Sequence, residues 1–131
     1  MKRALSPRFL LGLVPCVLAV ACGGVDRPGH VVGHIETLEG RTGVVCSVHV
    51  GRVAAKDYRS PCIDHTSDMA EGKVEAGHSF LCSALLNTKE DSQVLVECEG
   101  YSSQLSAPFH LPSSGRNQVD LGGITVRRPV L

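Results

Sequence analysis

The chain has 131 residues, and its 13 basic and 13 acidic side chains give a formal net charge of zero. This balance argues against a nucleic-acid-binding protein, which is expected to carry a basic surface. Aromatic residues make up 4% of the chain and tryptophan is absent, so few flat side chains are available to stack on sugars or bases. The length fits one ordinary domain.

The first segment has the features of an export signal. Lys2, Arg3 and Arg8 are followed by the uncharged stretch of residues 9–21. A positive start followed by 7–15 apolar residues is typical of a signal peptide, whereas a membrane-spanning helix needs about 20. We therefore predict a cleaved signal peptide over residues 1–21.

The end of this segment, LAVACGG over residues 18–24, resembles the bacterial lipobox. The resemblance implies that the Cys22 thiol accepts a diacylglyceryl group, which acts as a membrane anchor when more than one acyl chain is present. The resemblance also implies a place in the cell envelope, at the outer membrane because Gly23 follows the cysteine. The alternative is a free secreted protein, cleaved after the Ala-Val-Ala of residues 19–21.

Cleavage would leave a chain with a net charge of −3, because the removed segment carries only basic charges. Residues 22–29 are rich in glycine, and we expect them to form a flexible tether. Residues 30–131 would then form the folded domain.

Two segments of this domain show the period of two that indicates a half-buried strand. Apolar residues alternate with others over residues 44–51 and again over residues 94–99. Further strands are expected over residues 30–38, 78–85, 104–111 and 118–126. Residues 52–77 are irregular and are predicted to form a long loop or a short edge element pinned by Cys62. No segment has a sustained helical period, so an all-β sandwich is predicted.

Several short patterns within residues 30–127 resemble the carboxypeptidase regulatory-like domains. The patterns are V-x-G-x-I from Val31, C-x-V-x-V from Cys46, V-x-V-x-C-x-G-Y ending at Tyr101, and V-D-L-G-x-I-x-V from Val119. The resemblance implies a small Greek-key, transthyretin-like β-sandwich. The tyrosine is expected to bury its ring while its hydroxyl finds a partner at the edge of the sandwich.

Four cysteines remain in the domain, and an even number in an exported chain indicates two disulfides. Zinc is disfavoured because no close C-x₂₋₄-C pair is present. Four cysteines allow three pairings. If neighbouring strands form hairpins, Cys46 pairs with Cys62 and Cys82 with Cys98, which is the favoured arrangement. The alternative Cys46–Cys98 bond would tie two core strands.

Catalytic motifs are not evident in the sequence, and no catalytic residue, metal or cofactor is predicted. The best candidate for a metal site is the group Asp64, His65, Asp68 and Glu71, but a solvated polar loop is the favoured interpretation. This group lacks both the H-E-x-x-H helix and the regular oxygen-ligand spacing of a calcium loop.

We therefore expect a non-catalytic, membrane-anchored envelope lipoprotein whose β-sandwich is an accessory or protein-binding module. Its expected partners are the membrane, through the lipid anchor, and another envelope protein, without nucleic acid. Two alternatives remain: a structural envelope component, and a small metal-site protein or enzyme that uses the 52–77 loop.

Overall fold

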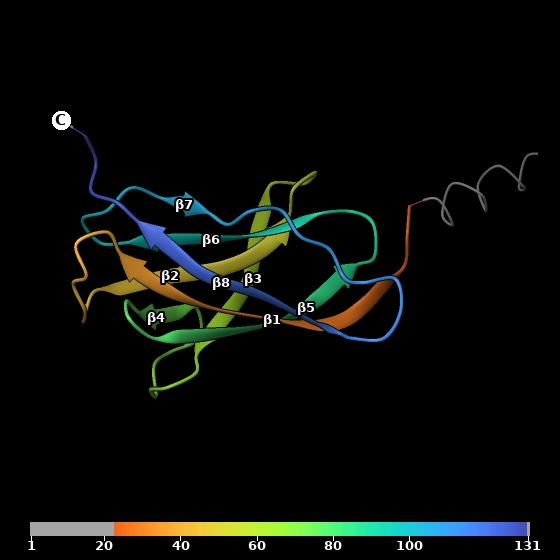
Figure 1. Ribbon diagram of the computed structural model, residues 1–131, viewed down its shortest axis with the longest axis horizontal. Helices are drawn as coiled ribbons and strands as arrows, with labels where there is room; N and C mark the ends of the chain where they lie inside the picture. The colour runs from red at the N-terminus through yellow and green to blue at the C-terminus, as the bar shows by residue number, and fades with distance from the viewer. Residues whose placement is uncertain (1–22, 131) are drawn as a thin grey trace, which may run out of the picture.

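The computed structural model describes residues 23–130 (Figure 1). The signal peptide predicted over residues 1–21 and the predicted lipid acceptor Cys22 lie outside the described residues. The described chain forms eight strands: β1 (Asp26–Thr37), β2 (Val45–Arg52), β3 (Asp57–Asp64), β4 (Lys73–Glu75), β5 (Ser79–Asn87), β6 (Ser92–Cys98), β7 (Gln104–Leu105) and β8 (Gln118–Val126). Within residues 23–130 no helix is long and apolar enough to cross a membrane. The all-β prediction is confirmed.

The strands form two sheets that share β3. The hydrogen-bonded order is β7-β6-β2-β3-β5-β1-β8, and β4 pairs with β2. Neighbouring strands are antiparallel except β1 and β8, which are parallel. Figure 1 shows β3 crossing steeply from one sheet to the other, with the start of the described chain and the C-terminus at opposite ends of the molecule.

The core lies between the two sheets and is filled mainly by small aliphatic side chains. The alternation expected for residues 44–51 and 94–99 is confirmed, because their inward residues are buried. Burial of this apolar surface is the main stabilising contribution to the fold. The largest side chains that are fully buried are Phe80, Ile35, Leu86 and Leu111.

Pairing between β3 and β5 is limited to the last residues of β3. Cys62, Ile63 and Asp64 face Cys82, Leu81 and Phe80, respectively. The next pair in this register would be Pro61 and Ser83. Proline has no N–H to donate to a ladder, so the pairing ends there.

A β-bulge interrupts the pairing of β2 and β3 near the start of β3. The register of β2 and β3 shifts between Val50 and Gly51, and bulges bend and twist the strand that contains them. A side chain at Gly51 would collide with the Asp57 carbonyl, so this close approach requires glycine. β3 therefore follows β2 over its first half, and β5 follows β1.

The structure corrects the favoured disulfide pairing. The bonds are Cys46–Cys98, between β2 and β6, and Cys62–Cys82, between β3 and β5. In each case the two cysteines are directly opposite each other on paired strands. The prediction was wrong because it assumed that β5 pairs with β6. The turn between them instead crosses from one sheet to the other, so the alternative Cys46–Cys98 bond is the one observed.

Three segment boundaries also differ from the predictions. The region predicted as a long loop, residues 52–77, contains β3 and β4. The predicted tether, residues 22–29, is shorter, because β1 begins at Asp26 and pairs from there with β5. The strand expected over residues 104–111 is limited to β7 and an isolated bridge at Phe109.

Candidate functional site

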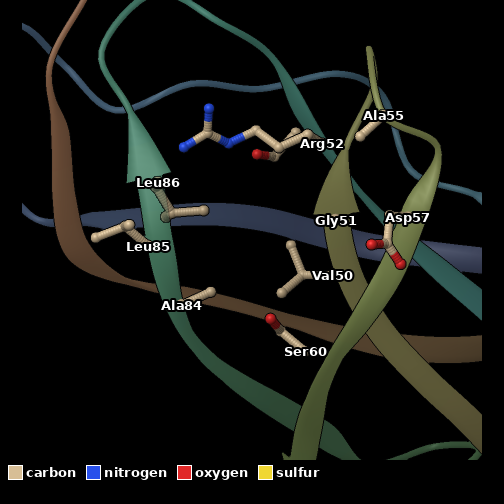
Figure 2. A pocket seen from close by; sticks show the side chains of 10 residues that line it. Val50, Gly51, Arg52, Ala55, Asp57, Ser60, Ala84, Leu85 and Leu86 are labelled. Carbon is tan, nitrogen blue, oxygen red and sulfur yellow. The ribbon is translucent and has the colours of Figure 1, made fainter.

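The separation of β3 from β5 creates a cleft, which we call the β3–β5 cleft (Figure 2). Its volume is about 170 Å³. In Figure 2, Ala84 and Leu86 of β5 face Val50 of β2 and Ser60 of β3 across the gap. The other lining residues are Gly51, Arg52, Ala55, Asp57, Leu85 and Ser92.

The β3–β5 cleft is the size of a single buried group. An apolar cavity of about 150 Å³ can hold benzene, so 170 Å³ has room for one apolar side chain of a partner. Val50 and Leu86 are 2% and 1% exposed and supply an apolar floor. Ser60 and Asp57 supply polar groups on the β3 side, and Asp57 Oδ1 lies 2.7 Å from Arg59 Nε.

One end of the cleft is closed by an ion-pair network. The Arg52 guanidinium lies 2.7 Å from Asp26 Oδ1 and 3.6 Å from Glu90 Oε2, and Figure 2 shows it extending toward β5. The Asn87 side-chain amide also donates to Asp26 Oδ1, at 2.7 Å. Hydrogen bonds from Asn87 and then Arg52 lower the pKa of Asp26, so this carboxylate stays charged and holds Arg52 in place.

The side wall formed by β5 has an unpaired strand edge over residues 83–86, which we call the β5 open edge; it ends at Asn87, whose carbonyl accepts a hydrogen bond from the Leu111 N–H at 2.8 Å. Residues two apart on an antiparallel strand direct their N–H and C=O groups to the same side. Ser83 and Leu85 therefore direct theirs toward β3, as Leu81 does. No strand in the described part of the chain pairs with them there, and the Leu85 side chain is 58% exposed.

Beyond the Cys62–Cys82 disulfide, the buried carboxylate of Asp64 holds the turn that follows β3. The Asp64 side chain is fully buried and accepts hydrogen bonds from the backbone N–H groups of Thr66, Ser67 and Glu75, at 2.9, 3.1 and 3.0 Å. The Thr66 hydroxyl donates to it as well, and His78 Nδ1 lies 2.9 Å from Asp64 Oδ2.

Burial alone would raise the pKa of Asp64. The hydrogen bonds from the backbone N–H groups of Glu75 and Thr66, followed by the bond with His78, outweigh this effect and hold the pKa well below its usual range. Asp64 is therefore a charged anchor for the turn after β3 and for β4. Its role is structural.

The candidate metal group is not assembled. Asp64 turns inward to its hydrogen-bond donors, whereas His65, Asp68 and Glu71 are exposed on the turn. Across residues 23–130 there is no group of three or more His, Cys, Asp or Glu side chains that could hold a metal ion.

The end of the molecule opposite the first described residues carries a second polar cluster. Tyr101 is 9% exposed, and its hydroxyl donates to Glu39 Oε2 at 3.0 Å. The Arg128 Nε donates to the same oxygen at 2.8 Å, and its guanidinium lies 5.2 Å from the tyrosine ring centre. Hydrogen bonding, chiefly from Arg128, lowers the pKa of Glu39 to about 2. The roles expected for the tyrosine ring and hydroxyl are confirmed.

Five histidine side chains have local hydrogen-bond partners rather than a shared site. The pairs are His30 with Ser83, His34 with Glu36, His49 with Ser47, His78 with Asp64 and His110 with Asp91. The partners lie on different elements, so these imidazoles do not converge on one pocket.

Sequence reasoning did not find the β3–β5 cleft, although two residues signal it. Pro61 ends the hydrogen-bond ladder, and Gly51 permits the close backbone approach at the bulge. The predicted strand over residues 44–51 includes Gly51 but does not reveal its contact with β3, because residues 52–77, which contain Pro61, were interpreted as a loop.

Comparisons with known proteins add little to this description. No protein-family model and no curated protein sequence matches the chain. Among solved structures, the chain is similar to the dioxygenase domain of a dioxygenase–carbohydrate-binding protein fusion from the cellulolytic bacterium Streptomyces sp. SirexAA-E. The sequence identity is 13%, the alignment covers 82% of this chain and 83% of that chain, and the TM-score is 0.39. Likeness at this level carries no argument about function.

Proposed function

We propose that this protein is a non-catalytic lipoprotein of the bacterial cell envelope, anchored through Cys22 at the outer membrane. In this proposal its β domain binds another envelope protein. The observation that carries the binding role is the β5 open edge beside the β3–β5 cleft. The lipobox-like residues 18–24 support the anchor.

The proposed mode of binding is strand addition. An extended segment of the partner would pair with the N–H and C=O groups of Ser83 and Leu85, which supply the main-chain hydrogen bonds of such complexes. An apolar side chain of that segment would enter the cleft between Val50 and Leu86. The pocket gives specificity for the side chain, while the strand edge gives affinity for the backbone.

Exposure also favours this site. Unpaired strand edges attract other strands, and natural proteins commonly cover or interrupt them. Here Leu85 is 58% exposed, and residues 83–86 include no charged side chain. A partner segment would satisfy these backbone groups and cover the leucine.

The anchor is tested by metabolic labelling with a fatty-acid probe. The wild-type protein should incorporate the label, and Cys22→Ala should not. Absence of label from the wild-type protein would refute the lipoprotein assignment.

The binding role is tested by photo-crosslinking in intact envelopes. A photoreactive residue replaces Leu85 in one variant and Leu38 in a second, because these leucines are 58% and 60% exposed. We expect the Leu85 position to yield one discrete adduct and the Leu38 position to yield none. Adducts of equal yield at both positions would contradict a binding site at the β5 open edge.

A third variant, Leu85→Pro, removes only a donor of the open edge. The Leu85 N–H points away from β1, so Leu85 and the opposite residue Pro28 share no ladder hydrogen bond and the β1–β5 hydrogen bonds are kept. With the photoreactive group at Ser60, on the opposite wall of the cleft, we expect Leu85→Pro to abolish the adduct and Leu85→Ala to retain it.

A further inference from the structure

The first described residues are fixed against the turn between β5 and β6. The Val25 N–H donates to Thr88 Oγ1 at 2.9 Å, and the Thr88 N–H donates to the Val25 carbonyl at 3.1 Å. Gly24 has a φ of +83°, and a side chain there would collide with Asn87 and crowd Lys89. The backbone is therefore held against the domain from Gly24 onward.

This attachment leaves a very short connection to Cys22. Only Gly23 and Gly24 separate Cys22 from Val25. Consecutive Cα atoms are 3.8 Å apart, so Cys22 and Val25 can be separated by about 11 Å at most. A domain fixed at this distance from its lipid anchor cannot stand away from the membrane surface.

The surface at this end has the chemistry of a membrane contact. We define the anchor-side pole as Val25 together with residues 88–91. Val25 is 59% exposed. Glu90 lies 3.6 Å from the Arg52 guanidinium, and Asp91 lies 3.0 Å from His110 Nδ1, so each acidic side chain of the turn already has a partner within the domain.

Lys89 is the remaining charge of this turn. It is exposed, and no acidic side chain of the described residues forms an ion pair with it. A lysine beside a membrane can bury its stem and direct its ammonium group to anionic headgroups. An exposed valine next to such a lysine fits the boundary between headgroups and acyl chains.

We infer that the anchor-side pole rests on the lipid bilayer, with Val25 inserted at the level of the headgroups and Lys89 bound to anionic lipid. The inference rests on the proposed lipidation of Cys22 and names the surface that the anchored domain presents to the membrane. Leu38 follows the other end of β1, at most about 40 Å farther along the strand at about 3.3 Å per residue. That end faces away from the bilayer.

Tryptophan fluorescence tests this orientation, because the natural chain contains no tryptophan. Val25→Trp and Leu38→Trp are a matched pair, since the natural side chains are 59% and 60% exposed. Lys89→Trp is a second reporter at the anchor-side pole if Val25→Trp is not processed. Each lipidated protein is reconstituted into vesicles of phosphatidylethanolamine and phosphatidylglycerol that contain a lipid with a nitroxide near the headgroup. Cys22→Ser versions give the unquenched baseline.

We expect emission from Val25→Trp to shift to shorter wavelength and to lose most of its intensity, while Leu38→Trp stays at the baseline. The orientation is wrong if vesicle-bound Val25→Trp and Lys89→Trp both emit at the baseline, or if Leu38→Trp is the quenched position. Flotation of the vesicles precedes the fluorescence measurement. A wild-type protein that carries no lipid and does not float refutes the proposed function itself, which distinguishes this result from a wrong orientation.

Discussion

The two halves of β3 differ in how they meet β5. Beyond Cys62 the strands are paired, and the buried Asp64 ties the following turn to the sheet. Before Cys62 the strands separate, and the β3–β5 cleft and the β5 open edge occupy the space between them. Pro61 stands at the boundary. A single residue without an N–H thus divides β3 and β5 into a paired half and an unpaired half.

The largest effect is expected from Asp64→Asn, which tests the closed half. The amide cannot accept all the hydrogen bonds that the carboxylate accepts, and it places an unsatisfied donor in a buried site. The expected loss of unfolding free energy is about 3 kcal/mol or more, or roughly 12 °C or more in Tm, measured by thermal and urea denaturation. The control Asp68→Asn makes the same change at an exposed position. Equal stability of the two variants would show that the Asp64 network is unimportant.

Removal of the boundary disulfide should have the next largest effect. The Cys62–Cys82 bond spans 20 residues, and its replacement by two serines should cost about 3 kcal/mol in the chain-entropy model. Hydrogen exchange at the Leu81 amide should accelerate, because the paired half then opens from the cleft. Replacement of Cys46 and Cys98 is the control. If it accelerates exchange at Leu81 more strongly, the Cys62–Cys82 bond does not define the boundary.

Lowering the pH should reduce the difference in unfolding free energy between the wild type and Asp64→Asn. The pKa of Asp64 is lower in the folded protein than in the unfolded chain. The ionised carboxylate therefore makes its full contribution to stability at pH values above its pKa in the unfolded chain. That contribution is lost progressively as pH falls below about 4 toward the folded value. Urea titrations at a series of pH values should therefore show the two stabilities converging below about pH 4. A constant difference down to pH 2 would mean that the carboxylate charge does not stabilise the closed half.

The smallest effect on stability is expected from Pro61→Val. The new N–H can donate to the Ser83 carbonyl, which adds about 1 kcal/mol, while the more flexible unfolded chain offsets a similar amount. Stability should therefore change by less than about 1 kcal/mol, yet the Leu85 crosslink to the partner should disappear as the cleft narrows. Pro28→Val is the control on β1 and should keep the crosslink. Loss of the crosslink in both variants would show that narrowing of the cleft is not its cause.

The strands with strong alternation could be predicted from the sequence. β2, β6 and β8 lie close to the predicted ranges, because each has one apolar face that must be buried. β3 could not be predicted, because Pro61 argues against a strand and most of its outward residues are polar. The predicted disulfide pairing was wrong for a topological reason. The consecutive strands β5 and β6 lie in different sheets, so cysteines close in the sequence are not opposite each other.

The candidate site was still less accessible to sequence reasoning. Asp64 belonged to a polar group that suggested a metal site. Its carboxylate instead accepts hydrogen bonds mainly from backbone N–H groups, which a sequence pattern cannot reveal. The β5 open edge depends on the absence of a partner strand, which is a property of the whole topology. Tyr101 was predicted correctly because a tyrosine after a strand end has few other ways to bury its ring and satisfy its hydroxyl.

Amide hydrogen exchange of the folded domain, resolved at single residues by NMR, tests the division of β5 most directly. We predict strong protection at Leu81, which faces β3 in the paired half, and fast exchange at Ser83 and Leu85, which face the cleft. Protection of Ser83 and Leu85 as strong as that of Leu81, in the absence of any partner, would show that no open edge exists and would contradict the account.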